Sequence, residues 1–288
     1  MRILILGGSG MLGHQLFKRL SKSHDVSVTL RRDLASYSSC GLFDTGNSYP
    51  QIELSSPEPL SKVLDDFRPG VIVNAAGVLK PGEGAAGISS MLDINSLLPR
   101  RLAQVCGGTG TRLIHMSTDG VFSGKTGGYR ESDTADAEDP YGKTKFLGEV
   151  CGPGCLTLRT SIIGRELINK TSLLEWLLSQ RGTVKGFSKV IFSGFTTLEL
   201  ARIVDKAIAE FPGASGLYHV SSDPISKKDL ITLLKDKLRL PVDIVADSKP
   251  SSDLSLDSTR FQSEFGYHPP TWETMIEELA QELLDTAK

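Results

Sequence analysis

The chain has 288 residues, 39% of them hydrophobic, and a formal net charge of −2. This length allows one or two domains with a sizeable core. The near balance of charge gives no reason to expect nucleic acid or an acidic membrane surface as a partner. The apolar start MRILILGG is too short for a signal peptide, and no apolar run reaches the ~20 residues that span a bilayer. We therefore expect a cytoplasmic protein without a membrane partner.

Cysteine usage points the same way. Cys40, Cys106, Cys151 and Cys155 are too sparse for a disulfide framework and form no CxxC pattern. Free thiols in a reducing compartment are the expected state. No cysteine or histidine spacing is typical of a metal site, so no metal is predicted.

Short apolar runs alternate with helical patterns in the first part of the chain. Strands are expected at residues 2–6, 26–30, 51–54, 71–77, 111–118 and 155–163. Helices are expected between them, after the first strand, from Ser56, around 90–105 and from Pro140. Continuous apolar strands separated by helices indicate a parallel sheet that is covered on both faces. This part therefore predicts an α/β, Rossmann-like doubly wound domain.

The rest of the chain has a mixed pattern. Helices are expected at 173–178, 198–210 and 274–284, and short strands at 189–192, 216–222 and 242–246. We assign residues 1–160, with about 186–213, to a dinucleotide-binding domain. Residues 161–185 and 214–288 would form a smaller, interleaved, mixed α/β substrate-binding region.

The stretch GGSGMLG follows the first expected strand and leads into an amphipathic helix. Glycines there allow a sharp turn, a close approach of backbone N–H groups to a pyrophosphate, and tight packing of helix on strand. The helix N-terminus adds a partial positive charge. A plain βα turn is the alternative, but the position favours a dinucleotide site. The predicted cofactor contacts are Gly7, Ser9, Gly10, Met11, Leu12 and Gly13.

The end of the second strand distinguishes the two nicotinamide cofactors. An acidic residue there would bind a ribose 2′-hydroxyl, whereas an arginine accommodates the 2′-phosphate of NADP. The chain has Arg31 and Arg32 at this place. We favour NADPH, with NADH as the second choice, and a merely solvated charged loop as the alternative.

A second motif lies in DPYGKTKFLGE. Asp139 suits a helix N-cap and Pro140 the first helical position. Tyr141 and Lys145 are then one turn apart on the same face. The strand before this helix ends at residues 117–119, on the edge of the sheet where ligands bind in open α/β folds. A hydroxyl there could join the tyrosine and lysine around one carbonyl oxygen, although an ordinary surface pair has the same spacing.

Taken together, these motifs resemble the extended short-chain dehydrogenase/reductases, and most closely their dTDP-4-dehydrorhamnose reductase branch. The resemblance covers nearly the whole chain. Matching segments occur in family order: GGSGMLG, VIVNAAG, MLDINSLLP, STDGVFSG, YGKTKFLGE, LTLRTSIIG, FTTLELA, GLYHVSS and a late Pro-Thr-Trp. YxxxK alone is a weak signal, but its combination with STDxVF, RTS and the glycine turn is specific for the superfamily.

The resemblance implies a catalytic role for three residues. Tyr141 would donate a proton to a carbonyl oxygen as hydride arrives from the nicotinamide. Lys145 would lower the pKa of the tyrosine and hold the nicotinamide ribose. Thr118 would hydrogen-bond the carbonyl, with Ser117 as a weaker candidate.

Further contacts follow from the same match. The additional cofactor contacts are Glu53, Asn74, Ala75, Ala76 and Ser117. The substrate contacts are Gly120, Val121, Phe122, Arg159, Ser161 and Lys249, the last as a candidate for the diphosphate or as a surface lysine.

The chain departs from the branch at several positions. Gly120, Ile162 and Gly164 stand where the branch usually has aromatic residues, so the pocket is expected to be less aromatic. The identity of the sugar is therefore left open. Gln15 stands where some members have a magnesium-binding glutamate, which again predicts no metal.

The sequence thus predicts an oxidoreductase that uses NADPH to reduce the 4-keto group of a nucleotide-activated 6-deoxyhexose, in nucleotide-sugar and surface polysaccharide biosynthesis. One alternative is a sugar-nucleotide epimerase or dehydratase with retained NAD. Another is a non-catalytic NADP-binding regulatory protein, although such proteins commonly lose the tyrosine or lysine that this chain keeps. A nucleotide sugar is the expected partner, nucleic acid is not, and a homodimer is left open.

Overall fold

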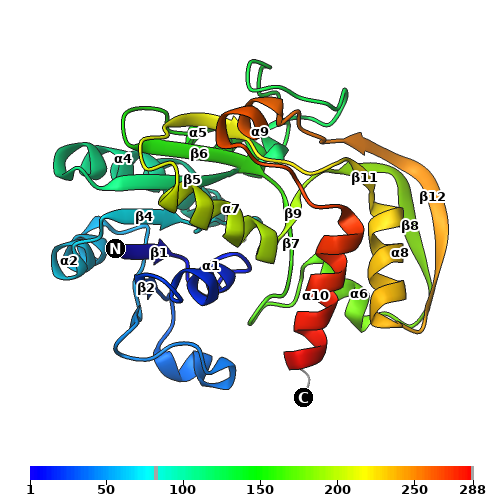
Figure 1. The fold of residues 1–288 in the computed structure, drawn as a ribbon, viewed down its shortest axis with the longest axis horizontal. Helices are drawn as coiled ribbons and strands as arrows, with labels where there is room; N and C mark the ends of the chain where they lie inside the picture. Colours follow the sequence, from blue (N-terminus) through cyan, green and yellow to red (C-terminus); the bar gives the residue numbers. More distant parts are fainter. Residues whose placement is uncertain (81–83, 287–288) are drawn as a thin grey trace.

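A seven-stranded parallel sheet forms the centre of the molecule in this computed structural model, which describes residues 1–80 and 84–286. The strand order is β10-β6-β5-β4-β1-β2-β3 (Figure 1). The strands are β1 (Arg2–Leu6), β2 (Asp25–Thr29), β3 (Ser48–Tyr49), β4 (Val71–Asn74), β5 (Arg112–Thr118), β6 (Cys155–Thr160) and β10 (Gly216–His219). The chain first adds strands on one side of β1 and then, from β4 on, on the other side, as in a doubly wound sheet. This arrangement confirms the predicted fold class.

Helices cover both faces of this sheet because successive side chains of a strand point to opposite sides. Ile3 and Ile5 of β1 pack in the core under α1 (Gly13–Leu20) and α7 (Thr197–Ala209). Leu4 and Leu6 pack in a second core with α2 and α4. The bounds of the helices and short turns in this part of the chain are α2 (Pro57–Phe67), α3 (Gly84–Leu92), η2 (Asp93–Leu97), α4 (Leu98–Thr109), α5 (Pro140–Leu147), η1 (Leu34–Cys40) and η3 (Asp119–Val121).

A smaller mixed sheet lies beside the large one, at the right of Figure 1. Its central strand β8 (Gly182–Phe192) runs antiparallel to β11 (Ile225–Ser226) and parallel to β12 (Val242–Asp253). A further two-stranded pair joins β7 to β9. The remaining elements are β7 (Ile162–Ile163), β9 (Phe195–Thr196), α6 (Leu173–Ser179), α8 (Lys227–Leu238), α9 (Thr259–Phe265) and α10 (Trp272–Thr286). The predicted smaller mixed unit is thus confirmed, with β8 and β12 longer than the short strands expected.

The chain passes between the two sheets at residues other than those expected from the sequence. β8 carries residues 182–192 into the small sheet, and β10 carries residues 216–219 back to the large sheet, where it pairs with β6. No helix within residues 1–80 and 84–286 has the length and apolar character needed to cross a bilayer.

Two local predictions need correction. The strand expected at 51–54 is wrong, since β3 ends at Tyr49. Pro50 has no N–H to donate, and Gln51 has a φ of 57°, which interrupts the extended backbone. The single helix expected around 90–105 is instead built from α3, the π-helical turn η2 and α4 in succession.

Candidate active site

The glycine turn between β1 and α1 has a geometry that other residues would not adopt. Gly7 has a φ of 80°, where a side chain is strained. A Cβ on Gly13 would lie 2.1 Å from the carbonyl oxygen of Gly7. The turn is tied to β2 by a hydrogen bond from the Gly7 N–H to Thr29 Oγ1 at 3.2 Å. These glycines therefore bring the start of α1 directly against the end of β1, as the sequence pattern predicts.

A cavity of about 260 Å³ lies against this turn. Residues 166–169, in the segment between β7 and α6, also line it. The lining includes nine of the residues predicted to contact the cofactor: Gly7, Ser9, Gly10, Met11, Arg31, Arg32, Glu53, Ala75 and Ala76. A glycine turn at a helix N-terminus beside two arginines suits a dinucleotide that carries an additional phosphate.

The arginine pair lines this cavity, as does the acidic Glu53. Arg31 and Arg32 are exposed, and neither forms a salt bridge within the part of the chain that the structure describes. The adjacent Asp33 turns toward Ser36, whose N–H and hydroxyl donate to its carboxylate at 2.9 and 2.7 Å. These hydrogen bonds hold the pKa of Asp33 below its usual value.

Two other predicted cofactor residues lie behind the cavity. Asn74 is fully buried at the end of β4. Its Oδ1 accepts a hydrogen bond from the Ala76 N–H at 3.2 Å, and its amide nitrogen contacts His115 Nδ1 at 3.2 Å. Asn74 therefore shapes the loop that lines the cavity. Leu12 is buried in the core beside α1.

Helix α5 starts as the sequence predicts. The Asp139 carboxylate caps it by accepting from the Gly142 N–H at 3.0 Å. A Cβ on Gly142 would lie 2.0 Å from the Gly120 carbonyl oxygen, so glycine lets α5 touch the turn after β5. Lys145 is 4% exposed, and its Nζ donates to the Met116 carbonyl at 2.5 Å. Burial lowers the pKa of Lys145 to about 8.

The phenol of Tyr141 lies at the same strand end. Burial raises the pKa of Tyr141 to about 12, and the charge of Asp119 adds to the rise. The Thr118 hydroxyl acts in the opposite direction and lowers the pKa of the phenol, but this effect is smaller than that of burial. The lowered pKa expected for Tyr141 is therefore wrong for this structure, because burial raises it; the Lys145 ammonium donates to the Met116 carbonyl. Tyr141 is therefore protonated at neutral pH.

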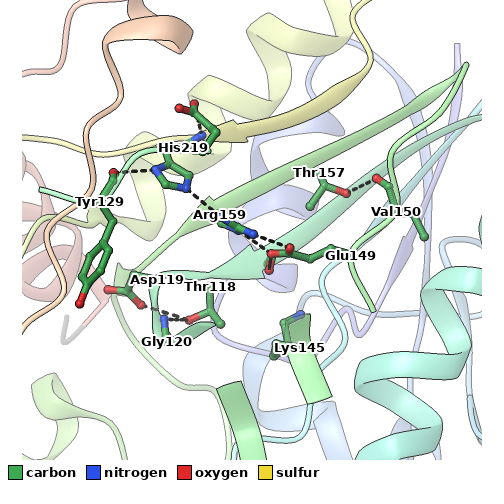
Figure 2. A network of polar contacts seen from close by, with 12 residues as sticks. Thr118, Asp119, Gly120, Tyr129, Lys145, Glu149, Val150, Thr157, Arg159 and His219 are labelled. Atoms are coloured by element: carbon green, nitrogen blue, oxygen red, sulfur yellow. Dashed lines mark hydrogen bonds and ion pairs between the residues drawn. The ribbon is translucent and has the colours of Figure 1, made fainter. Parts of the chain in front are cut away.

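The sequence reasoning assigned no role to Asp119, which lies between these groups. Thr118 Oγ1 donates to Asp119 Oδ1 at 3.1 Å and accepts from the Gly120 N–H at 3.0 Å (Figure 2). Asp119 is 6% exposed, and burial raises its pKa to about 6. The STD motif contained the signal for this contact, since a carboxylate directly after a threonine can accept from its hydroxyl.

A buried ion pair supports the next strand. Glu149 accepts from Arg159 Nε and Nη2 at 2.7 Å each (Figure 2). It also accepts from the Ser117 hydroxyl at 2.7 Å. The side chains of Arg159 and Glu149 are only 4% and 6% exposed. Arg159 and Ser117, which were expected to contact the substrate and the cofactor, thus share Glu149 as a hydrogen-bond partner.

His219 of β10 completes this network. Its Nδ1 lies 2.9 Å from the Tyr129 carbonyl and its Nε2 lies 3.1 Å from Arg159 Nη1 (Figure 2). A carbonyl can only accept and a guanidinium can only donate, so the imidazole is neutral with its proton on Nδ1. Burial lowers the pKa of His219 in agreement with that state. The sequence analysis named Arg159 and Ser117 but assigned no role to Glu149 or His219.

The remaining predicted substrate residues are divided between core and surface. Val121 and Phe122 are buried, and Phe122 stacks on Tyr129 with ring centroids 4.1 Å apart. Ser161 hydrogen-bonds Asp119 at the active site. Lys249 lies exposed on β12, where the register with β8 shifts.

A second cavity of about 360 Å³ lies between α6, β8 and α8. Trp176 and Phe187 give it aromatic walls, and Lys185 and Lys227 give it positive charge. The charge of Lys227 also slightly favours the ionised form of Asp119.

No metal site is formed by the described residues, in which no group of three or more His, Cys, Asp or Glu side chains could hold an ion. Gln15, at the position where a metal-binding glutamate was considered, donates to the Glu282 carboxylate at 2.8 and 2.9 Å. It thereby joins α1 to α10.

Comparisons with known proteins agree with this architecture. The chain is 25% identical to dTDP-4-dehydrorhamnose reductase of Aggregatibacter actinomycetemcomitans, over 96% of this chain and 98% of that protein. It is 26% identical to methionine adenosyltransferase 2 subunit beta of Bos taurus, over 83% of this chain and 73% of that protein. The fold matches dTDP-4-dehydrorhamnose reductase of Bacillus anthracis in complex with NADP, with a TM-score of 0.78, 20% identity and coverage of 98% and 99%.

One family describes nearly the whole chain. The RmlD substrate binding domain family matches residues 1–285. That span contains the glycine turn, the arginine pair and the Thr118, Tyr141 and Lys145 cluster. The chain therefore belongs to the RmlD substrate binding domain family, among the extended short-chain dehydrogenase/reductases that are similar to dTDP-4-dehydrorhamnose reductase.

Proposed function

We propose that this protein uses NADPH to reduce the 4-keto group of a nucleotide-activated 6-deoxyhexose. One observation carries the proposal. The phenol of Tyr141, a proton donor at neutral pH, lies with Thr118 and Lys145 at the same sheet edge as the glycine-turn cavity. A proton donor beside a dinucleotide site is the arrangement that carbonyl reduction requires.

In the proposed reaction, Tyr141 transfers its phenolic proton to the oxygen of the substrate carbonyl. When bound, the reduced nicotinamide supplies the hydride to the carbonyl carbon. The buried Lys145 keeps a positive charge near the strand end that would hold the developing negative charge in place. A proton then returns to Tyr141 from solvent after the alcohol has formed.

The choice of NADPH rests on Arg31 and Arg32. Both line the cavity beside the glycine turn, and the neighbouring carboxylate of Asp33 is directed at Ser36. Two exposed guanidinium groups favour a phosphate on the adenosine ribose over a free hydroxyl.

The substrate class rests on the second cavity. Its aromatic walls offer a surface for a nucleobase, and Lys185 and Lys227 offer positive charge for a diphosphate. A nucleotide sugar bound in this way would extend its ketosugar from this cavity toward Tyr141.

A regulatory role is the second candidate, and the similarity to methionine adenosyltransferase 2 subunit beta favours considering it. Such a role needs the cofactor site but not the proton donor. The presence of Tyr141, Lys145 and Thr118 together argues for catalysis.

The test is NADPH consumption by the pure protein with a panel of dTDP-, UDP- and GDP-linked 4-keto-6-deoxysugars. We expect oxidation with at least one of them, and a loss of about 10²–10⁴-fold in Tyr141→Phe, which removes the donated proton. The variant should bind NADPH as the wild type does. NADPH binding without turnover of any sugar would overturn the reductase and favour the regulatory role. Tightly retained NAD in the purified protein would favour an epimerase or dehydratase.

A further inference from the structure

A chain of buried polar groups joins β5 to the backbone that lines the cavity at the glycine turn. Asn74 and His115 lie opposite each other on β4 and β5, and both side chains are fully buried. The amide nitrogen of Asn74 lies 3.2 Å from His115 Nδ1, and its Oδ1 accepts from the Ala76 N–H at 3.2 Å. Ala76 lines the cavity and packs on the turn, since a Cβ on Gly7 would lie 3.0 Å from the Ala76 Cα.

The direction of each hydrogen bond in this chain of groups is fixed by chemistry. The Ala76 N–H can only donate, so it must face the oxygen of the Asn74 amide. The NH2 group of Asn74 then points at His115 and can also only donate, so Nδ1 must be the acceptor. The imidazole is therefore neutral and carries its proton on Nε2. Burial lowers the pKa of His115 well below its usual value, in agreement with that state.

The other side of the imidazole shows that packing alone does not account for a histidine here. His115 Nε2 is buried and has no hydrogen-bond partner in the part of the chain that the structure describes. An unpaired buried N–H destabilises the folded state, and an apolar side chain of similar size would avoid that cost. The feature that an apolar side chain would lack is the acceptor at Nδ1.

We propose that His115 is a positioning residue of the cofactor site: its Nδ1 holds the Asn74 amide with the oxygen toward the Ala76 N–H, and so keeps the Ala76 backbone against the glycine turn. The inference rests on the cofactor site of the proposed function and adds to it a fully buried residue that acts through Asn74. Without this acceptor, the NH2 group of Asn74 loses its partner and the amide is free to turn away from Ala76.

Two substitutions separate positioning from packing. His115→Leu fills the site with an apolar side chain but removes the acceptor. His115→Asn is smaller, yet its amide oxygen can accept from Asn74 at about the place of the imidazole Nδ1. A packing role ranks His115→Leu above His115→Asn, because leucine leaves less empty volume and buries no polar group. The positioning role predicts the reverse order at the cofactor site.

The first readout is amide hydrogen exchange, measured by NMR on protein labelled with ¹⁵N-alanine, and it needs no cofactor or substrate. The neighbouring Ala75 N–H donates to the Leu6 carbonyl at 3.2 Å and serves as the internal control. We expect the Ala76 N–H to exchange about tenfold faster in His115→Leu while Ala75 is unchanged. In His115→Asn both amides should exchange as in the wild type. Equal acceleration of the two amides in His115→Leu would show a general loss of stability and would overturn the proposal.

The second readout is the affinity for NADPH and NADH, measured by fluorescence titration. His115→Leu should bind both cofactors about three- to tenfold more weakly, and His115→Asn should bind them nearly as the wild type does. The matched control is Thr157→Val, which removes another fully buried hydrogen bond of the same sheet, from the Thr157 hydroxyl to the Val150 carbonyl at 2.6 Å. It should leave both affinities unchanged. An equal loss in Thr157→Val, or affinities that follow the packing order, would contradict the positioning role.

A measurement on the wild type keeps the proposal testable if His115→Leu does not fold. Long-range proton–nitrogen NMR should show His115 with a bare Nδ1 and a protonated Nε2, its signals among the five histidines being assigned by their loss in His115→Asn. A proton on Nδ1 would refute the proposal. The tautomer and the exchange rates are readable even if no ketosugar is reduced, so failure here is distinct from failure of the reductase.

Discussion

Two charged regions of the molecule differ in how their side chains are paired. At the glycine turn, Arg31 and Arg32 line the cavity, are exposed to solvent and form no salt bridge among the described residues. At the edge of β5 and β6, the charged groups have partners inside the fold. Arg159 and Glu149 satisfy each other there, and Asp119 holds the Thr118 proton. The shape of the first region is set by the backbone, and its charged side chains are exposed to solvent. The second region is shaped by buried polar side chains.

This difference separates binding from chemistry in physical terms. Exposed arginines near a helix N-terminus can bind a phosphate group, and in water they remain solvated when no ligand is bound. A proton donor needs a fixed position and a defined pKa, which buried and fully hydrogen-bonded neighbours provide. Substitutions at the buried edge should therefore change stability and proton affinity, and substitutions at the glycine turn should change cofactor binding.

The largest effect is expected from Arg159→Met. It leaves the buried Glu149 carboxylate without its guanidinium partner, and removing one member of a buried ion pair costs about 3–5 kcal/mol. Urea unfolding of the purified variant measures the change in the free energy of unfolding.

The control is Arg19→Met, which breaks the more exposed pair between Arg19 and Asp205. A loss of under about 1 kcal/mol is expected for it. If Arg159→Met lost no more free energy of unfolding than Arg19→Met, the buried ion pair would not stabilise the edge of β5 and β6.

The next effect is a gain in stability, in Asp119→Asn. In the wild type the folded-state pKa of Asp119 is raised from 3.8 to about 6, so the ionised carboxylate disfavours the folded state above that pH. A shift of about two units corresponds to up to about 3 kcal/mol. This penalty shrinks as the pH falls through about 6 toward the unfolded value, where both states are protonated.

Asp119→Asn cannot ionise, so its advantage over the wild type should be largest near pH 8 and absent near about pH 4. Thermal unfolding of the two proteins across this range checks the prediction. A pH-independent difference would mean that Asp119 is not the titrating group, and a loss of stability near pH 8 would mean that its hydrogen bonds outweigh its buried charge.

At the glycine turn, Gly13→Ala should weaken binding of NADPH and NADH alike by at least about tenfold, or about 1.4 kcal/mol. The new Cβ would meet the Gly7 carbonyl oxygen at 2.1 Å, so the backbone of the turn must move. Fluorescence titration with each cofactor measures the loss.

Gly107→Ala is the matched control, because Gly107 lies in α4 and a Cβ there meets no atom within 4 Å. It should leave cofactor affinity unchanged and stabilise the helix by about 0.5–1 kcal/mol. Unchanged cofactor binding in Gly13→Ala would show that the turn does not have to be as tight as the structure has it.

The same contrast explains which features could be predicted from the sequence. The glycine turn, the boundaries of β1 and the Asp139 cap of α5 depend on neighbouring residues, and the sequence analysis found all three. The strand at 51–54 failed because Pro50 and a left-handed Gln51 override the apolar pattern.

The buried edge depends on distant residues instead. Arg159 and His219 are separated by 60 positions and meet only because β10 pairs with β6. No local spacing encodes that contact, so the partners of Arg159 were missed. The raised pKa of Tyr141 was missed for the same reason, since it depends on burial and on the charge of Asp119.

The smallest effect, and the most selective, is expected at the arginine pair. Arg31→Gln and Arg32→Gln each remove a positive charge from the cavity lining without disturbing a salt bridge of the described residues. A variant that loses a charge-assisted hydrogen bond to the 2′-phosphate should bind NADPH about tenfold more weakly and NADH as before. Lys22→Gln, which removes an exposed charge elsewhere, controls for net charge.

The NADPH preference of the wild type should also decline as salt is raised, because exposed charges are screened. Equal affinity of the wild type for both cofactors would mean that the open arginines belong to a solvated loop, and the division between a binding region and a chemical region would then rest on the glycine turn alone.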